Sequence, residues 1–260
     1  MLRPDIVEML EGLRDADPNH DVVRCLNSNG LLVTSALARR LAGLADEVRI
    51  SLDGFERQND ALRGNGNFAA ATKALHVYRE AGLNPKILIT VTRQTLPDLE
   101  EFLMFLVGRG FTSINVNWFR PIGRGKGHND WCVRGADIKH AIRRAFSRLG
   151  AHPTSPGGTV ETDSQYHCGV GRFLNIMPNG DVFPCHVLTN PEFRCGNVKT
   201  QNLLDICRQN GLLGQLGNLD FRVLANEEPA VAELTKADTC FGSVYAEKHR
   251  LNVWRNHLTI

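Results

Sequence analysis

The sequence predicts an α/β fold, namely an open, partial βα barrel of parallel strands followed by a small, cysteine-bearing α+β domain. Helical and strand patterns alternate with short connections over residues 3–127, which is typical of parallel βα units. Only four strands fit into this segment, whereas a closed eight-unit barrel needs about 250 residues. A hairpin pattern bounded by two cysteines, at residues 168–185, predicts the smaller domain.

The elements of the first part follow one another in regular order. Pro4 suits the first turn of a helix, Thr34 or Ser35 can cap the next one, and Gly82 is a natural helix end. Strands are expected near 22–26, 47–54, 86–92 and 113–119, and helices near 4–13, 35–44, 67–81 and 97–107.

Three of these strands alternate apolar and polar residues, as in a sheet that is covered by helices on one face only. The polar positions include Ser51, Asp53, Thr90 and Asn117. Ligands of α/β sheets bind at the carboxyl ends of the strands. The pattern therefore predicts one polar, concave surface for a small polar cofactor. The alternative is an open face that only solvent covers.

The composition limits the class of protein. The chain has 260 residues, of which 42% are hydrophobic and 22% charged, and this predicts a globular protein of one large domain or two smaller ones. No run of 18 apolar residues predicts a membrane span, and no secretory signal is recognisable, so a cytoplasmic location is expected. A net charge of +2 gives no electrostatic reason to expect a nucleic-acid partner.

Two glycine-rich stretches could suggest phosphate binding. RGNGNF at 63–68 and GRGKG at 123–127 both lack a strand directly before their glycines, which a dinucleotide fingerprint requires. We interpret the second stretch as a flexible basic loop that leaves the sheet. Residues 128–165 follow as a connector with a helix near 136–149, so the expected domains are 1–127, this connector and 166–260.

The stretch CGVGRFLNIMPNGDVFPC at 168–185 predicts a β-hairpin with a Pro-Asn-Gly-Asp turn. A hairpin brings its ends together, so Cys168 and Cys185 are expected close enough to share a disulfide or a metal centre. Structural disulfides are rare in the cytosol, and seven cysteines are an odd number for a bridged framework. The metal centre is therefore favoured over a disulfide or inert buried thiols.

Taken together, these segments resemble the radical S-adenosylmethionine (radical SAM) enzymes that carry a C-terminal SPASM or twitch domain. The resemblance covers nearly the whole chain, with its fragments in the family's order. The matching segments are LNSNGLL (26–32), VRISLDG (48–54) with NDALRGNGNF (59–68), TVTRQTLPDLEEF (90–102), FRPIGRGKG (119–127), the hairpin at 168–185 and GNV (196–198).

The resemblance implies an auxiliary four-iron, four-sulfur (4Fe-4S) cluster held by thiolates, the soft ligands that such clusters need. Its ligands would be Cys168, Cys185 and, because CFGSVYA resembles the segment after the family's last clustered cysteine, Cys240. Cys195 or Cys207 could supply a fourth ligand or only pack. Positions 227, 230 and 236, where the family has further cysteines, carry none, so no second auxiliary cluster is expected.

The resemblance also implies a cofactor and a reaction. Ser51, Asp53 and Arg63 would contact the ribose and carboxylate of S-adenosylmethionine, and Thr90 and Asn117 would lie further along the same surface. The family cleaves this cofactor reductively to give a 5′-deoxyadenosyl radical, and electrons come from a donor such as flavodoxin or ferredoxin. The substrate would be a peptide or a cofactor precursor such as a tetrapyrrole.

The chain departs from the family pattern at its front. It has neither the Cys-x3-Cys-x2-Cys motif of the catalytic cluster nor the Gly-Gly-Glu-Pro element. We therefore expect an N-terminal truncation that removes the first two barrel strands and exposes a sheet edge, no catalytic residues in this chain, and no activity of the chain alone. A non-catalytic iron–sulfur scaffold and a zinc module, with His167 or His186 beside the three cysteines, are the alternatives.

Overall fold

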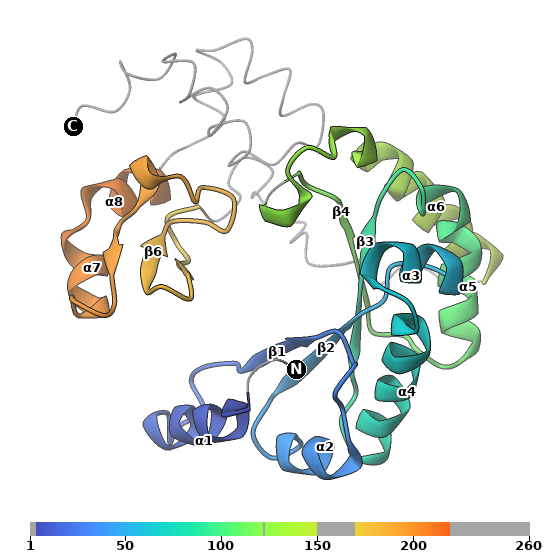
Figure 1. Cartoon of the computed structure of the whole chain (residues 1–260), viewed down its shortest axis with the longest axis horizontal. Coiled ribbons are helices and arrows are strands. Elements are labelled where there is room, and N and C mark those ends of the chain that lie inside the picture. Colours follow the sequence, from blue (N-terminus) through green and yellow to red (C-terminus); the bar gives the residue numbers. More distant parts are fainter. Residues whose placement is uncertain (1–3, 122, 150–169, 219–260) are drawn as a thin grey trace. The chain divides into compact units, whose positions relative to one another are not determined.

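A computed structural model describes residues 4–121, 123–149 and 170–218 of the chain. The chain divides into two compact units, Met1–Thr159 and Val160–Ile260, and each is described by itself (Figure 1). Within the described residues, no helix combines the length and apolar character that crossing a membrane requires.

The first unit is built on a four-stranded parallel sheet, which confirms the expected fold class. The strands are β1 (Cys25–Ser28), β2 (Glu47–Ser51), β3 (Lys86–Val91) and β4 (Ile114–Trp118). They lie side by side in chain order, and each pairs in parallel with the next. Among the described residues, β1 pairs only with β2 and is therefore an edge strand.

The first strand begins later than the sequence pattern suggests. The expected strand at 22–26 is wrong at its start, because β1 begins only at Cys25. Val22 and Val23, which lie before it, are 59% and 72% exposed. The carboxylate of Asp17 accepts hydrogen bonds from the backbone N–H groups of Asp21 and Val22. This local turn holds the chain away from the sheet, so two β-branched residues lie outside the strand.

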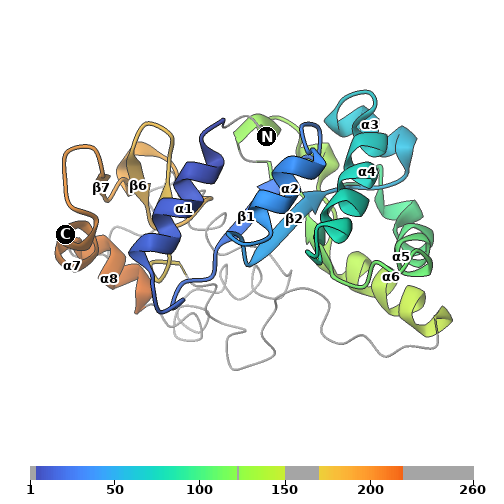
Figure 2. The same cartoon turned by 90° about the horizontal axis from the view of Figure 1, so that it is seen from below.

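Helices cover one face of this sheet, and Figure 2 shows α4, α5 and α6 on the same side of the strands. The helices are α1 (Ile6–Ala16), α2 (Ser35–Leu41), α3 (Glu56–Arg63), α4 (Asn67–Glu80), α5 (Leu99–Gly108) and α6 (Gly135–Arg148), with 3-10 turns η1 (Leu96–Asp98), η2 (Gly123–Gly125) and η3 (Asn129–Trp131). Ile50, Ile87 and Ile89 are completely buried under this layer. Thr34 caps α2 by accepting a hydrogen bond from the N–H of Leu37.

Helix α3 was not expected from the sequence. It is very polar, and among its eight residues only Asn59 is buried. A helix of this kind has no apolar stripe, which is the signal that periodicity depends on.

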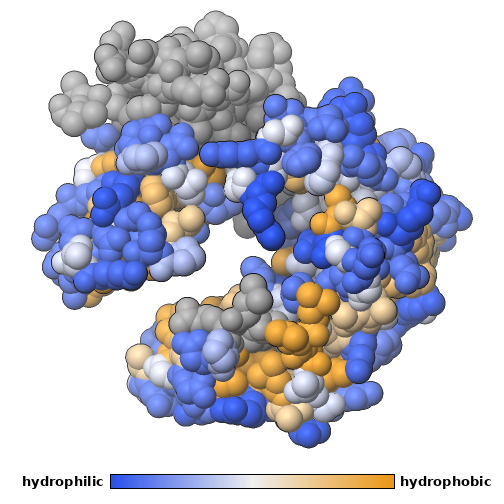
Figure 3. All heavy atoms as spheres, in the orientation of Figure 1, coloured by the Kyte–Doolittle hydropathy of each residue, from blue (hydrophilic) through white to orange (hydrophobic). Residues whose placement is uncertain are grey.

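Apolar surface is not confined to the core. Figure 3 shows apolar side chains gathered on the visible face around β1 and α2. Exposed apolar residues on either side of β1 include Val22, Val23, Leu31 and Leu32. This end of the first unit is the most apolar part of the visible surface.

The second unit contains the expected hairpin. Strands β5 (Asn175–Ile176) and β6 (Asp181–Phe183) pair antiparallel, and β7 (Gly196–Asn197) pairs with β6 on the other side. The turn η5 (Pro191–Phe193) and the helices α7 (Leu203–Gln209) and α8 (Gly211–Gly217) complete the described part. Val182, Cys195, Ile206 and Leu213 form its small core.

The turn of the hairpin depends on a glycine and an aspartate. Gly180 has a φ of +91°, and its N–H donates to the Met177 carbonyl at 2.8 Å. The Asp181 carboxylate accepts hydrogen bonds from Asn197, Asn179 and Arg194, and these contacts lower the pKa of Asp181. The same carboxylate therefore fixes the turn and joins it to β7.

Candidate cofactor surface and cluster cysteines

Three of the expected site residues share the open face of the sheet. In the parallel register, Ser51 pairs with Leu88, and Thr90 pairs with Asn117. Residues two apart on a strand share a face, so Ser51, Thr90 and Asn117 all point away from the buried Ile50 and Ile89. Within the described part of the chain, their side chains have no hydrogen-bond partner. These groups are thus available to a polar ligand.

Asp53 is placed behind this surface rather than on it. The residue is 5% exposed, and its carboxylate oxygens accept hydrogen bonds from Arg63 Nε at 2.7 Å and from the Thr90 N–H at 2.8 Å. Arg63 is itself one quarter exposed. Asp53 therefore neutralises and orients Arg63, which leaves the remaining N–H groups of this guanidinium for a ligand.

A chain of buried amides holds Asp53 from the other side. The Asp53 N–H donates to Asn59 Oδ1 at 3.0 Å, Asn59 Nδ2 donates to Asn67 Oδ1 at 3.0 Å, and Asn67 Nδ2 donates to the Asn29 carbonyl at 3.1 Å. Asn59 and Asn67 are 0% and 1% exposed. The relay joins the segments that follow β1 and β2 to the start of α4.

Two further features explain the local sequence. Gly30 has a φ of +80°, and a Cβ atom there would lie 2.8 Å from Ala71 Cα, so only glycine fits against α4. The Asp60 carboxylate accepts hydrogen bonds from the backbone N–H groups of Phe68 and Gly66, which lower the pKa of Asp60. Three of the fragments that carry the family resemblance, at 26–32, 48–54 and 59–68, thus meet at one place, although the sequence pattern indicated neither Asn59 nor Asn67 as a site residue.

The amino ends of the strands carry a separate charge cluster on the open face. Glu47 accepts a hydrogen bond from Lys86 Nζ at 2.6 Å and another from Arg49. Desolvation acts to raise the pKa of Glu47, but the hydrogen bonds from Lys86 and Arg49 outweigh it and lower the pKa. Both cations of this cluster therefore already have a carboxylate partner, which they share.

Cys185 lies two residues after the end of β6 and is 2% exposed. The Val187 N–H donates a hydrogen bond to its sulfur at 3.3 Å. Cys168 and Cys240 lie outside the described residues. The Gly171 N–H donates to the Pro184 carbonyl at 3.1 Å, so the chain three residues after Cys168 lies beside the residue before Cys185. Within the described ranges, no three His, Cys, Asp or Glu side chains form a metal site.

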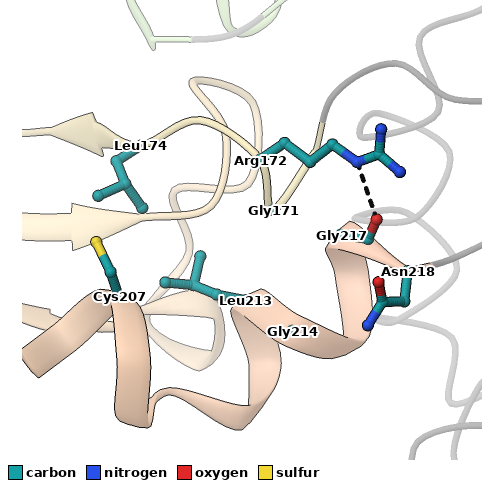
Figure 4. Close-up of a pocket in the computed structure, with 8 residues that line it drawn as sticks. All are labelled: Gly171, Arg172, Leu174, Cys207, Leu213, Gly214, Gly217 and Asn218. Carbon is teal, nitrogen blue, oxygen red and sulfur yellow. Dashed lines mark hydrogen bonds between the residues drawn. The ribbon is translucent and has the colours of Figure 1, made fainter. Parts of the chain in front are cut away.

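Cys195 and Cys207 have different environments. Cys195 is buried, its Sγ donates to the Phe193 carbonyl at 3.5 Å, and desolvation, with Cys207 nearby, raises the pKa of Cys195 to about 11. A neutral, hydrogen-bonded thiol of this kind fits packing. Cys207 is exposed and lines a cavity of about 370 Å³ with Leu174 and Arg172 (Figure 4). Arg172 is held there by the hydrogen bond from its Nε to the Gly217 carbonyl.

Comparison with known proteins covers both units. Residues 168–233 match the SPASM iron–sulfur cluster-binding domain. The mycofactocin maturase MftC of Mycobacterium ulcerans (strain Agy99) is 30% identical over 267 residues, which cover 95% of this chain and 68% of the relative. MftC of Mycobacterium tuberculosis (strain ATCC 25618 / H37Rv) is 31% identical over 269 residues, with 95% and 64% covered. The chain thus spans about two thirds of the length of these relatives.

Solved structures show the same fold. Native anSMEcpe with bound AdoMet superimposes with a TM-score of 0.64 at 16% identity, over 83% of this chain and 66% of that one. Streptococcus suis SuiB bound to its precursor peptide SuiA gives a TM-score of 0.66 at 17% identity, over 83% and 53%.

Proposed function

The chain belongs to the radical SAM enzymes that carry a SPASM iron–sulfur domain, and from this premise we propose that its open sheet face binds S-adenosylmethionine and its second unit an auxiliary 4Fe-4S cluster. One observation carries the first half. Ser51, Thr90 and Asn117 share a face near the carboxyl ends of three adjacent strands, and the polar groups of their side chains have no partner within the described residues.

Each residue of this face contacts a different part of the cofactor. Arg63, oriented by Asp53, binds the cofactor's carboxylate, for which a guanidinium has the matching donor geometry. Ser51 hydrogen-bonds the ribose, and Thr90 and Asn117 contact the cofactor further along the face. S-adenosylmethionine supplies radical chemistry when it is cleaved reductively, and the protein supplies position and charge.

For the cluster, we propose Cys168, Cys185 and Cys240 as ligands. The donor chemistry fits, because Cys185 is buried and an N–H group is directed at its sulfur, as at metal-bound thiolates. A zinc site is the second candidate, and the observation that favours it is His186 Nδ1, which lies 4.0 Å from Cys185 Sγ.

We propose a peptide as the substrate. SuiB was solved with its precursor peptide and anSMEcpe with the Cp18Cys peptide, and both share this fold. The neutral hydroxyl and amide groups of the open face suit the alternating donors and acceptors of a peptide backbone. An electron donor such as flavodoxin or ferredoxin completes the reaction, because reductive cleavage consumes an electron.

The test of this proposal is the formation of 5′-deoxyadenosine. The 260 residues contain no Cys-x3-Cys-x2-Cys motif, so after reconstitution and reduction with dithionite they should form none. A form preceded by a segment with that motif should form it. In that form, Thr90→Val should weaken cofactor binding about fivefold in equilibrium dialysis, because one hydrogen bond is lost.

Thr72→Val is the matched control. Its hydroxyl is buried in α4 and has no hydrogen-bond partner in the described part of the chain, so the same isosteric change should leave cofactor binding unaltered. Equal affinities of the two variants would contradict the assignment of the open face. The 260 residues alone should not cleave the cofactor. If they did, and if Cys168→Ala abolished this cleavage, the result would show that the second unit holds the catalytic cluster.

A further inference from the structure

The loop after β4 is rich in cations and poor in acids. We call residues 119–131 the cationic loop, with residue 122 outside the described part. From 102 to 131 the sequence contains one acidic residue, Asp130, whereas Arg120, Arg124 and Lys126 fall within seven positions. This is the GRGKG stretch that matched no phosphate-binding motif.

Both ends of the cationic loop are tied to the end of β3. The Phe119 N–H donates to the Val91 carbonyl at 2.9 Å, and the Arg93 N–H donates to the Trp131 carbonyl at 3.0 Å. The rings of Phe119 and Trp131 lie 5.4 Å apart and close the loop. The loop is thereby fixed at the carboxyl edge of the sheet, next to the end that carries Thr90 and Asn117.

The cations of this region are not neutralised. Arg93, Arg124 and Lys126 are exposed, and within the described residues their side chains have no ion pair, hydrogen bond or ring contact. Arg120 has only a ring contact, with its guanidinium 5.2 Å from the centre of Trp118. Elsewhere in the first unit, by contrast, Arg49 and Lys86 on the sheet and Arg63 at the end of α3 all contact carboxylates.

From this placement we propose that the cationic loop and Arg93 bind acidic residues of the peptide substrate, next to the residue presented to the open face. The inference rests on the proposed function and names a property of its substrate. Asn117 lies two residues before the start of the cationic loop, so a peptide that lies on Asn117 has these cations beside it. Trp131, whose ring lies 4.1 Å from that of His128, adds a flat apolar surface for side chains of the same peptide.

A nucleic acid fits these observations less well. The cations occupy one short loop and one neighbouring residue, whereas the whole chain has a net charge of only +2. Nucleic-acid interfaces need a basic surface that follows many phosphates. A short acidic peptide requires only a few charge contacts, which this loop can offer.

The proposal can be tested by fluorescence anisotropy with the 260-residue chain and a fluorescein-labelled peptide of about twelve residues that alternates Glu and Ser, at about 0.05 M salt. The double variant Arg124→Glu/Lys126→Glu should weaken binding at least about tenfold, because charge reversal adds repulsion to the lost attraction. Raising the salt to about 0.3 M should also weaken binding to the unchanged chain.

Arg39→Glu/Arg40→Glu is the matched control, since both arginines are exposed on α2 and the change in net charge is the same. This variant should bind within about twofold of the unchanged chain, as exposed charges that are distant from the ligand are screened. A peptide with Gln in place of Glu should bind weakly to all forms.

Equal losses in both double variants would overturn the proposal, as would tighter binding of a dT oligonucleotide or of coproporphyrin than of the Glu peptide. The measurement involves neither S-adenosylmethionine nor the iron–sulfur cluster. Failure of the cofactor assay therefore leaves this result standing, and failure of this binding leaves the cofactor assignment standing.

Discussion

Tyr78 illustrates what a single side chain contributes to the first unit. It is completely buried in the core, its hydroxyl has no hydrogen-bond partner within the described residues, and desolvation raises its pKa to about 12. Burial of the apolar ring stabilises the fold, whereas the hydroxyl loses its hydrogen bonds to water and gains none from the described residues. The phenol therefore stays neutral, and its oxygen is a cost to stability.

Tyr78→Phe should raise the free energy of unfolding by about 1 kcal/mol, because the unsatisfied group is removed and the ring remains. The unchanged chain should also lose stability as the pH rises from 10 towards 12, since the unfolded state releases the proton first, and the Phe variant should lack this loss. Urea unfolding measures both effects. Tyr78→Leu, which leaves a cavity, should destabilise by about 2 kcal/mol; a Phe variant as unstable as this one would mean that the hydroxyl has a partner.

At the same scale, the sequence predicts some site residues and misses others for a physical reason. Ser51, Thr90 and Asn117 could be found because strand alternation assigns each residue to a face. Asn59 and Asn67 could not, because their burial results from contacts between segments that are distant in sequence. A buried asparagine in a polar stretch has no periodic signal.

Among the elements, the hairpin of the second unit is the one that its turn residues specify most directly. Gly180 adopts a positive φ, and a Cβ atom there would lie 2.7 Å from Asn197 Oδ1. The pattern of apolar strands and a Pro-Asn-Gly-Asp turn was sufficient to predict β5 and β6. The sequence pattern does not predict helix α3, because this helix has no apolar stripe. It places the start of β1 too early, because hydrogen bonds to Asp17 hold Val22, a β-branched residue, outside the strand.

Gly180→Ala should destabilise the hairpin by about 1–2 kcal/mol, since alanine is strained at this φ and its Cβ meets Asn197. Hydrogen exchange of the Asp181–Phe183 amides measures the local effect. Gly214→Ala is the matched control, because Gly214 lies inside α8 with nothing within 4 Å of the added atom. That change should be neutral or stabilising by about 0.5 kcal/mol. Faster exchange in the Gly214 variant than in the Gly180 variant would refute the role of the turn.

At the scale of the whole molecule, the cysteines in the sequence limit how many iron–sulfur clusters one chain can bind. Anaerobic reconstitution with iron and sulfide should load about one cluster per chain, because the second set of family cysteines is absent. Cys168→Ala or Cys185→Ala should abolish loading, measured as bound iron, sulfide and absorbance at about 400 nm. Cys25→Ala and Cys195→Ala should not, since one thiol is exposed on β1 and the other is packed and neutral. Equal loading of all four variants would contradict the ligand assignment, and a colourless zinc complex would favour the second candidate.

The relay of amides behind the open face also has a direction. It starts at a backbone N–H, that of Asp53, and ends at a backbone carbonyl, that of Asn29, and neither group can exchange its role. Each amide between them must therefore point its oxygen towards Asp53 and its nitrogen towards Asn29. An aspartate at either position would set two acceptors face to face, and turning the neighbouring amide would only move that conflict one link along. Replacing a single nitrogen by oxygen in this row therefore either leaves two acceptors face to face or requires the new carboxyl group to stay protonated, although the change alters neither the size nor the shape of the side chain.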